Sequence, residues 1–212
     1  MKIKDPTIRK ILEEHSFSVV RGLNDYIDLF GFPLVNSLKA LRPKEHWLDA
    51  GAGEGKAIRE FLLASSKNDI FTTAVTLKMS SPIIHPAHKT IVNYLEDLPQ
   101  ETIRSCDLIT DVEGGLQYTD QLDQLLKRYI VWLKPQGKLF VSLVPESTWI
   151  EKAGELLSFT DWIMGISGLA VTPGSAEGAL IIMKEASNHS LPRLKLIEAK
   201  SSEIFTRKFK EM

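Results

Sequence analysis

The chain has 212 residues, of which 43% are hydrophobic and 25% charged, so it is long enough to bury a sizeable core. Its formal net charge of -1 gives no overall field that would attract nucleic acid or an anionic membrane surface. Cys106 is the single cysteine, which excludes an intrachain disulfide and fits a reducing compartment. The N-terminal sequence MKIKDPTIRKILEEH lacks the apolar segment of a signal peptide, and no stretch approaches the roughly 20 apolar residues of a membrane span. We therefore expect a cytoplasmic protein that makes no use of a membrane.

Residues 1–43 are predicted to form a helical N-terminal extension. Asp5 and Pro6 match the N-cap and the first position of a helix, because the Asp side chain accepts from the first turn and Pro needs no hydrogen bond there. A second helix is predicted over 18–30, where apolar residues recur at helical spacing, and a short third helix begins at Pro33.

From residue 44 onward, predicted strands and helices alternate. Strands are expected at 46–50, 70–77, 90–95, 106–110 and 138–144. Helices are expected over 55–64, 120–133 and 149–166. Such alternation predicts a parallel sheet whose crossover connections are right-handed.

The C-terminal part departs from this alternation. GLAVT and ALIIMKE are joined by the turn PGSAEG and are predicted to form an antiparallel hairpin at one edge of the sheet. Residues 186–212 form a tail whose basic residues, with Phe205 and Phe209 between them, could contact RNA phosphates but are more typical of a solvated edge. We expect one domain over 1–212, with 44–185 as its core.

A glycine-rich turn, HWLDAGAGEGKA (46–57), follows the first predicted strand and excludes two common nucleotide sites. A P-loop needs Gly and Ser or Thr at the positions that Ala50 and Ala57 occupy. The dinucleotide fingerprint needs a small residue where Lys56 stands, because the helix and strand pack closely there.

The acidic residue at the tip of the first strand gives a positive indication. A carboxylate at Asp49 would disfavour a pyrophosphate but favour a ligand that carries ammonium and sulfonium groups. The glycines that follow allow close approach of the backbone, and the N-terminus of the next helix suits a ligand carboxylate. S-adenosylmethionine has all of these groups.

WLDAGAGEG resembles the first motif of the class I S-adenosylmethionine-dependent methyltransferases. LEDLP (95–99), CDLITD (106–111) and LKPQGKLFVSL (133–143) fall where this family places its later motifs, so the resemblance spans residues 45–185. It implies an α/β, Rossmann-like fold with helices on both faces of a mostly parallel seven-stranded sheet whose last strand is antiparallel.

The resemblance also implies a set of residues that bind S-adenosylmethionine. Its methionine portion would lie at the turn, against Asp49, Ala50, Gly51 and Gly53. The family usually has an acid at the end of the second strand, binding both ribose hydroxyls, whereas this chain has Thr76, followed by Leu77. Thr76 offers one hydroxyl and no charge. After the third strand, Glu96 and Asp97 are candidates to accept from the adenine amino group.

The segment DVEGGLQY after the fourth strand supplies the candidate catalytic residues. Asp111 and Glu113 are expected at the carboxyl ends of the parallel strands, where open α/β sheets bind ligands, and either could act as a general base. Asp111 is also a candidate cofactor ligand, and Tyr118 could line the acceptor pocket or cap the next helix. No metal site is expected, because His85 and His88 lack partners at ligand spacing.

We therefore expect a methyltransferase that transfers the sulfonium methyl in line to a small molecule. Two alternatives remain open. One is a methyltransferase for RNA or protein, although the near-neutral charge argues against nucleic acid. The other is a non-catalytic protein that binds S-adenosylmethionine or another partner, which the missing ribose acid favours.

Overall fold

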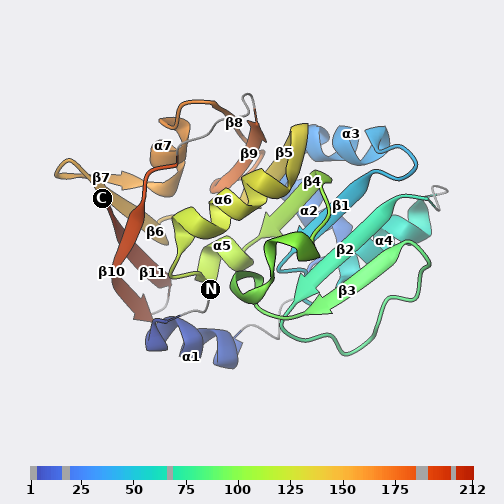
Figure 1. Ribbon diagram of the computed structural model, residues 1–212, viewed down its shortest axis with the longest axis horizontal. Coiled ribbons are helices and arrows are strands. Elements are labelled where there is room, and N and C mark those ends of the chain that lie inside the picture. Colours follow the sequence, from blue (N-terminus) through green and yellow to red (C-terminus); the bar gives the residue numbers. More distant parts are fainter. Residues whose placement is uncertain (1–3, 16–19, 66–68, 185–190, 202–203) are drawn as a thin grey trace.

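The computed structural model describes residues 4–15, 20–65, 69–184, 191–201 and 204–212 (Figure 1). In chain order the elements are α1 (Pro6–His15), α2 (Leu23–Phe30), α3 (Phe32–Ala40), β1 (His46–Ala50), α4 (Lys56–Ala64), β2 (Phe71–Thr76), β3 (His88–Val92), η1 (Leu95–Asp97), η2 (Gln100–Thr102), β4 (Cys106–Val112), α5 (Gly115–Tyr118), α6 (Leu122–Trp132), β5 (Leu133–Ser142), β6 (Thr148–Lys152), β7 (Glu155–Ser158), α7 (Phe159–Met164), β8 (Leu169–Pro173), β9 (Ala179–Lys184), β10 (Leu194–Ser201) and β11 (Phe205–Glu211).

The main sheet has seven strands in the order β3-β2-β1-β4-β5-β9-β8, which confirms the predicted sheet. The pairs from β3 to β5 are parallel, whereas β9 runs antiparallel to both β5 and β8. The predicted C-terminal hairpin is therefore confirmed as β8 and β9. Because β1 lies in the middle of the sheet and the order reverses beside it, the loops after β1 and β4 diverge around a point where ligands bind in open α/β sheets.

Helices cover both faces of the main sheet, as predicted. Alternation along β1 sends Trp47 to the face covered by α2, α3 and α4, and Leu48 to the face covered by α5 and α6 (Figure 1). Both side chains are fully buried. The near-continuous burial of β1, β2 and β4 is expected for a parallel sheet with helices on both sides.

The predicted helix over 149–166 is wrong in its first half. Residues 148–158 form the hairpin of β6 and β7, and only α7 is helical. Ala153 and Gly154 have φ of 51° and 88°, a left-handed turn that joins two strands and cannot lie inside a helix. β6 instead pairs in a sheet with β11, a partner that lies about 60 residues further along the chain and that local periodicity does not reveal.

Residues 191–212 contain the two strands that complete a second sheet, in the order β10-β11-β6-β7. β11 is parallel to β6 and antiparallel to β10, so the expected tail is part of the folded structure. Figure 1 shows this small sheet at the left, with α1 below it and the main sheet to the right. Phe209 of β11 joins the same core cluster as Tyr129 of α6, so the two sheets share one core.

Several other predicted elements have different limits; β5, for example, begins at Leu133 and not at residue 138. α2 begins at Leu23, and the first two residues of the predicted helix over 18–30 lie outside the described residues. β3 begins earlier than the predicted strand over 90–95 and ends at Val92, because the chain turns there into the short helix η1. Among the helices in the described part of the chain, none has the length and apolar composition needed to cross a membrane.

Two glycines with positive φ give a test of how β9 is attached to β5. A Cβ at Gly178 (φ 75°) would lie 2.2 Å from the carbonyl oxygen of Leu143, whereas a Cβ at Gly154 (φ 88°) would meet nothing within 4 Å. We expect Gly154→Ala to cost about 1 kcal/mol, from the left-handed backbone alone. Gly178→Ala should cost about 2 kcal/mol more, because β9 must move away from β5. Urea unfolding of both variants measures this difference, and equal costs would contradict it.

Candidate functional site

A cavity opens at the carboxyl ends of β1, β2, β3 and β4. It encloses about 740 Å³ of empty space, including the part that is open to solvent. The sheet contributes the loops after these strands, and the N-terminal extension contributes residues from α1 and from the segment before α2. The lining residues are Leu12, Arg21, Gly51, Gly53, Val75, Thr76, Leu77, Asn93, Tyr94, Leu95, Glu96, Glu113, Gly114, Gly115 and Tyr118.

The floor of the cavity is a contact between two backbone turns. Gly51 has a φ of 83°, and a Cβ there would lie 2.6 Å from the Cα of Gly114. A Cβ on Gly114 would in turn lie 2.6 Å from the carbonyl oxygen of Ala50. Neither position accepts a side chain without moving the other turn, so the loops after β1 and β4 meet only because both residues are glycine.

Asp49 lies beneath this floor and does not line the cavity. Its side chain points to the α2 face of the sheet, as alternation along β1 requires, and it is 0% exposed. Tyr26 donates to both carboxylate oxygens at 3.0 and 3.1 Å, and Thr110 donates to Oδ1 at 2.7 Å. Burial raises the pKa of Asp49 to about 7. The Asp49 side chain is thus turned away from the residues that line the cavity, and neighbouring Ala50 is buried as well. Direct contact of Asp49 with a cationic ligand group stays a prediction.

Asp111 is also buried, under the loop after β4. Its Oδ1 accepts from the backbone N–H of Gly114 at 2.9 Å, and its Oδ2 accepts from that of Leu116 at 2.9 Å and from the Tyr129 hydroxyl at 2.7 Å. Burial raises the pKa of Asp111 to about 6. A buried carboxylate with these partners holds the loop in place and does not reach the cavity. Contact of Asp111 with the cofactor or the reacting groups stays a prediction, and its side chain is not among those that line the cavity.

Glu113 lies in the cavity wall, held by a residue that the sequence analysis missed. Its side chain forms an ion pair with Arg21, and the two side chains are 29% and 24% exposed. Arg21 also donates to the carbonyl oxygen of Val112 at 3.4 Å. Glu113 has a φ of 45°, a left-handed conformation that non-glycine residues adopt rarely and often at functional sites. No local motif marks Arg21, since its partner is far along the chain.

The loops after β2 and β3 bring further predicted residues to the cavity. Glu96 is 3% exposed, and burial raises its pKa, while the Thr119 side chain partly opposes this shift. Thr76 donates its hydroxyl to the carbonyl oxygen of Lys78 at 2.8 Å, so this hydroxyl is used in the turn after β2. Leu77 also lines the cavity, whereas Asp97 does not.

Sequence comparison finds no match: no model of a known protein family fits this chain, and no curated protein matches it. Solved structures do match it in fold. An rRNA methylase from Streptococcus thermophilus aligns with a TM-score of 0.50 at 12% identity, over 80% of this chain and 100% of that one. The CurJ carbon methyltransferase also aligns with a TM-score of 0.50, at 16% identity, over 73% of this chain and 52% of that one.

The chain has the fold of class I S-adenosylmethionine-dependent methyltransferases. A putative sarcosine dimethylglycine methyltransferase from Galdieria sulphuraria also aligns, at 15% identity and a TM-score of 0.39 over 51% of this chain. The present chain spans 43% of the length of that protein.

In this methyltransferase fold, the chemistry available at the cavity comes from carboxylates, one guanidinium and backbone N–H groups. Glu96 and Glu113 can accept hydrogen bonds from hydroxyl, amino or cationic groups, and Arg21 can bind a carboxylate. His88 lies instead at the start of β3, hydrogen-bonded to Thr72 and Thr90 at 2.9 Å each. Within the described residues, no group of three or more His, Cys, Asp and Glu is arranged to hold a metal ion.

Burial of Asp49 predicts a measurable pH dependence of stability. Its pKa of about 7 in the folded protein exceeds the ordinary value of 3.8, so the folded state binds the proton more tightly than the unfolded state does. This carboxyl therefore favours folding most at low pH, and the contribution is lost as the pH rises from about 4 through about 7. The free energy of unfolding should fall by at most about 4 kcal/mol through this group.

The measurement is urea unfolding of the wild type and of Asp49→Asn between pH 4.5 and pH 8.5. The difference between the two curves isolates Asp49 from the other carboxyls, and the wild type should lose stability relative to the variant as the pH rises. Parallel curves would show that Asp49 is ionised in the folded protein at all these pH values.

Proposed function

We propose that this chain is an S-adenosylmethionine-dependent methyltransferase that acts on a small molecule. The observation that carries the proposal is the cavity on the glycine turn, with Gly51 and Gly53 on one side and Glu96, Glu113 and Arg21 around it. It lies at the carboxyl edge of the sheet, where this fold binds ligands.

The residues of the cavity fit the groups of S-adenosylmethionine. Gly51 and Gly53 leave the backbone open to the methionine portion, and a Cβ at Gly51 would close this space. Arg21 offers a cation for the methionine carboxylate, and Glu96 offers an acceptor for the nucleoside. Thr76 keeps an oxygen lone pair for a ribose hydroxyl, although its own hydroxyl already donates a hydrogen bond to the carbonyl oxygen of Lys78. When bound, S-adenosylmethionine supplies a methyl group activated by a sulfonium.

The remaining lining residues suit the acceptor. Leu12 and Tyr118 supply apolar surface that excludes water, and Glu113 presents a carboxylate that can hold an acceptor N–H or O–H and take its proton. Arg21 fixes the orientation of Glu113 through the ion pair. The N-terminal extension covers the cavity with Leu12 and Arg21, which supports a small acceptor over a macromolecule.

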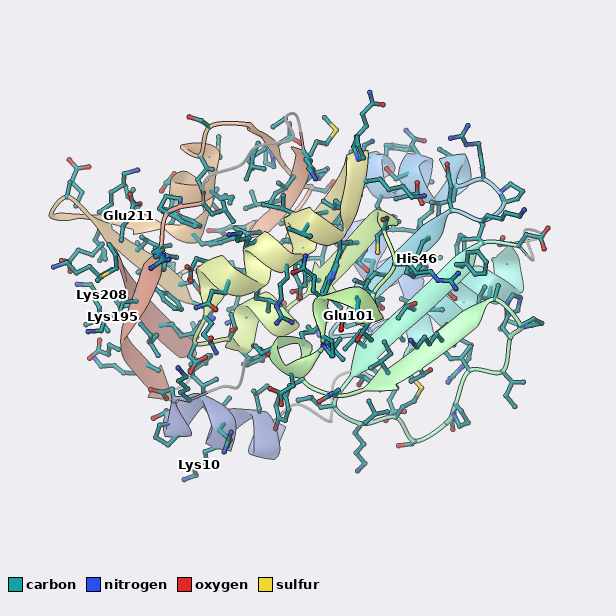
Figure 2. All side chains as sticks on the ribbon, viewed as in Figure 1. Lys10, His46, Glu101, Lys195, Lys208 and Glu211 are labelled. Atoms are coloured by element: carbon teal, nitrogen blue, oxygen red, sulfur yellow. The ribbon has the colours of Figure 1, made fainter. Side chains whose placement is uncertain are left out.

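The basic residues near the C-terminus give little support to the RNA alternative. Lys208 and Lys210 pair with Glu151 at 3.0 and 3.6 Å, and Lys152 pairs with Glu211 at 3.5 Å. Figure 2 shows Lys195, Lys208 and Glu211 together at the left of the molecule, on the small sheet. Interleaved acids compensate part of the charge on this surface, which weakens the case for phosphate binding there.

We expect S-adenosylhomocysteine to bind with a dissociation constant on the order of micromolar, which corresponds to about -8 kcal/mol. Isothermal titration calorimetry on the purified chain measures this value. A flat titration at millimolar ligand would exclude the proposed cofactor.

Two glycine variants place the ligand on the turn. Gly51→Ala should weaken the binding of S-adenosylhomocysteine by at least about tenfold, because the new Cβ occupies the cavity floor and displaces Gly114. Gly55→Ala is the matched control, since Gly55 has a similar φ of 67° but its Cβ would meet only the ends of the flexible Ile83 and Met79 side chains. Affinity should change less than about threefold in this control. Equal affinities in both variants would mean that the ligand does not cross the turn.

Glu113→Gln tests the proposed proton acceptor. We expect turnover to fall by about 100-fold, because the amide keeps the shape of the side chain but takes no proton. S-adenosylhomocysteine affinity should stay within about threefold of the wild type. Turnover is followed by transfer of a labelled methyl group to fractions of a metabolite pool, with an RNA pool in parallel. Glu155→Gln, in the exposed β6–β7 turn, serves as the control.

Methyl transfer to the RNA pool alone would replace the small-molecule assignment by the RNA alternative. Cofactor binding without transfer to either pool would favour the non-catalytic alternative. Unchanged turnover in Glu113→Gln would remove Glu113 from the proton transfer while leaving the methyltransferase assignment intact.

A further inference from the structure

Arg207, in β11 of the small sheet, is a buried cation far along the chain from the glycine turn. It is 1% exposed, and burial lowers its pKa to about 9, so it still carries its charge at neutral pH. No described residue forms an ion pair with it. A guanidinium buried without a paired carboxylate is costly and calls for a reason in its contacts.

One of those contacts reaches the loop that connects α5 to α6, and the others lie within the small sheet. Nη1 donates to the carbonyl oxygen of Thr119 at 2.7 Å, and Nη2 donates to the Thr148 hydroxyl at 2.6 Å. The charged group lies 5.8 and 5.5 Å from the ring centres of Phe205 and Phe209. Nε is buried, and no described residue is hydrogen-bonded to it.

Thr119 connects Arg207 to the cavity in two ways. It ends α5, and Gly115 and Tyr118 of this short helix line the cavity. The Thr119 side chain also lies close enough to Glu96, the carboxylate on the opposite loop of the same cavity, to favour its charged form. Thr119 is itself 0% exposed, so its carbonyl would lose a hydrogen bond that water could not replace.

A ring contact reinforces this connection. Tyr118 stacks on Phe205, with ring centres 5.8 Å apart and an interplanar angle of 13°. Phe205 thus contacts both Tyr118 and the Arg207 guanidinium. The small sheet therefore holds the cavity wall through a backbone hydrogen bond and through an aromatic stack.

We propose that Arg207 is a positioning residue for the cavity, which fixes the wall 115–119 and, through Thr119, the Glu96 side chain. The effect on ligand affinity rests on the proposed function. The effect on the wall does not, because it follows from contacts within the chain.

The test is amide hydrogen exchange on the full chain without ligand, for the wild type, Arg207→Met and Arg207→Lys. Met keeps the length of the side chain but donates nothing, whereas Lys keeps a cation that can reach the Thr119 carbonyl. We expect protection of the amides at 115–119 to fall at least tenfold in Arg207→Met. Arg207→Lys should recover part of that loss, while protection in β1 and β4 stays unchanged.

Trp162→Phe is the matched control for destabilisation of the small sheet. Trp162 of α7 donates to the side chain of Glu211 at 2.9 Å, and Glu211 lies in β11, the strand that also carries Arg207. No hydrogen bond or ring contact joins Trp162 to the described residues of the wall 115–119. This variant should lower the melting temperature without a selective loss of protection at 115–119. If Arg207→Met does not fold, Arg207→Lys decides: a selective loss of protection at the wall supports the proposal, and an even loss across the chain contradicts it.

Calorimetry with S-adenosylhomocysteine then separates this inference from the proposed function. The Arg207→Met variant should bind S-adenosylhomocysteine at least fivefold more weakly than the Trp162→Phe variant does. If the wild type binds no S-adenosylhomocysteine, the cofactor assignment fails, whereas the exchange data still decide the role of Arg207. Unchanged protection at 115–119 in a folded Arg207→Met would overturn the positioning role.

Discussion

The close approach of two backbone turns, at Gly51 and Gly114, is the constraint on which the candidate site depends. Each residue occupies the space that a Cβ on the other would need, at separations of 2.6 to 3.0 Å. The contact brings the ends of β1 and β4 together without any side chain between them. Because the floor consists of backbone, the space above it is open to a ligand, and the polar groups that surround this space come from other loops.

Two buried carboxylates hold this floor from below. Asp49 is hydrogen-bonded to Tyr26 and Thr110, and Asp111 receives the N–H groups of the loop after β4. Burial opposes ionisation of both, which raises their pKa values to about 7 and about 6. Hydrogen bonds from neutral donors offset part of this cost. The acids thus stabilise the geometry of the turns, while the carboxylates available to a ligand are Glu96 and Glu113.

Both ends of the chain complete the cavity. The N-terminal extension provides Leu12 and Arg21, and Arg21 holds Glu113 in its left-handed conformation from across the cavity. The C-terminal strand β11 provides Arg207 and Phe205, which support the wall at Tyr118 and Thr119. The two ends are where a preference for one acceptor would be expected to reside.

The sequence by itself determined the main sheet, because the predicted strands at 46–50 and 106–110 and the glycine turn carry strong local patterns. It also determined which loops reach the cavity, since the carboxyl ends of parallel strands share one edge. Only the tertiary structure decided the rest. Asp49 and Asp111 lie on the strands that were expected to carry them. Whether their side chains face the cavity or the core depends on how the helices and loops pack around those strands. The pairing of β6 with β11, the Arg21–Glu113 ion pair and the burial of Arg207 join residues that are far apart in the chain, and local periodicity carries no information about such contacts.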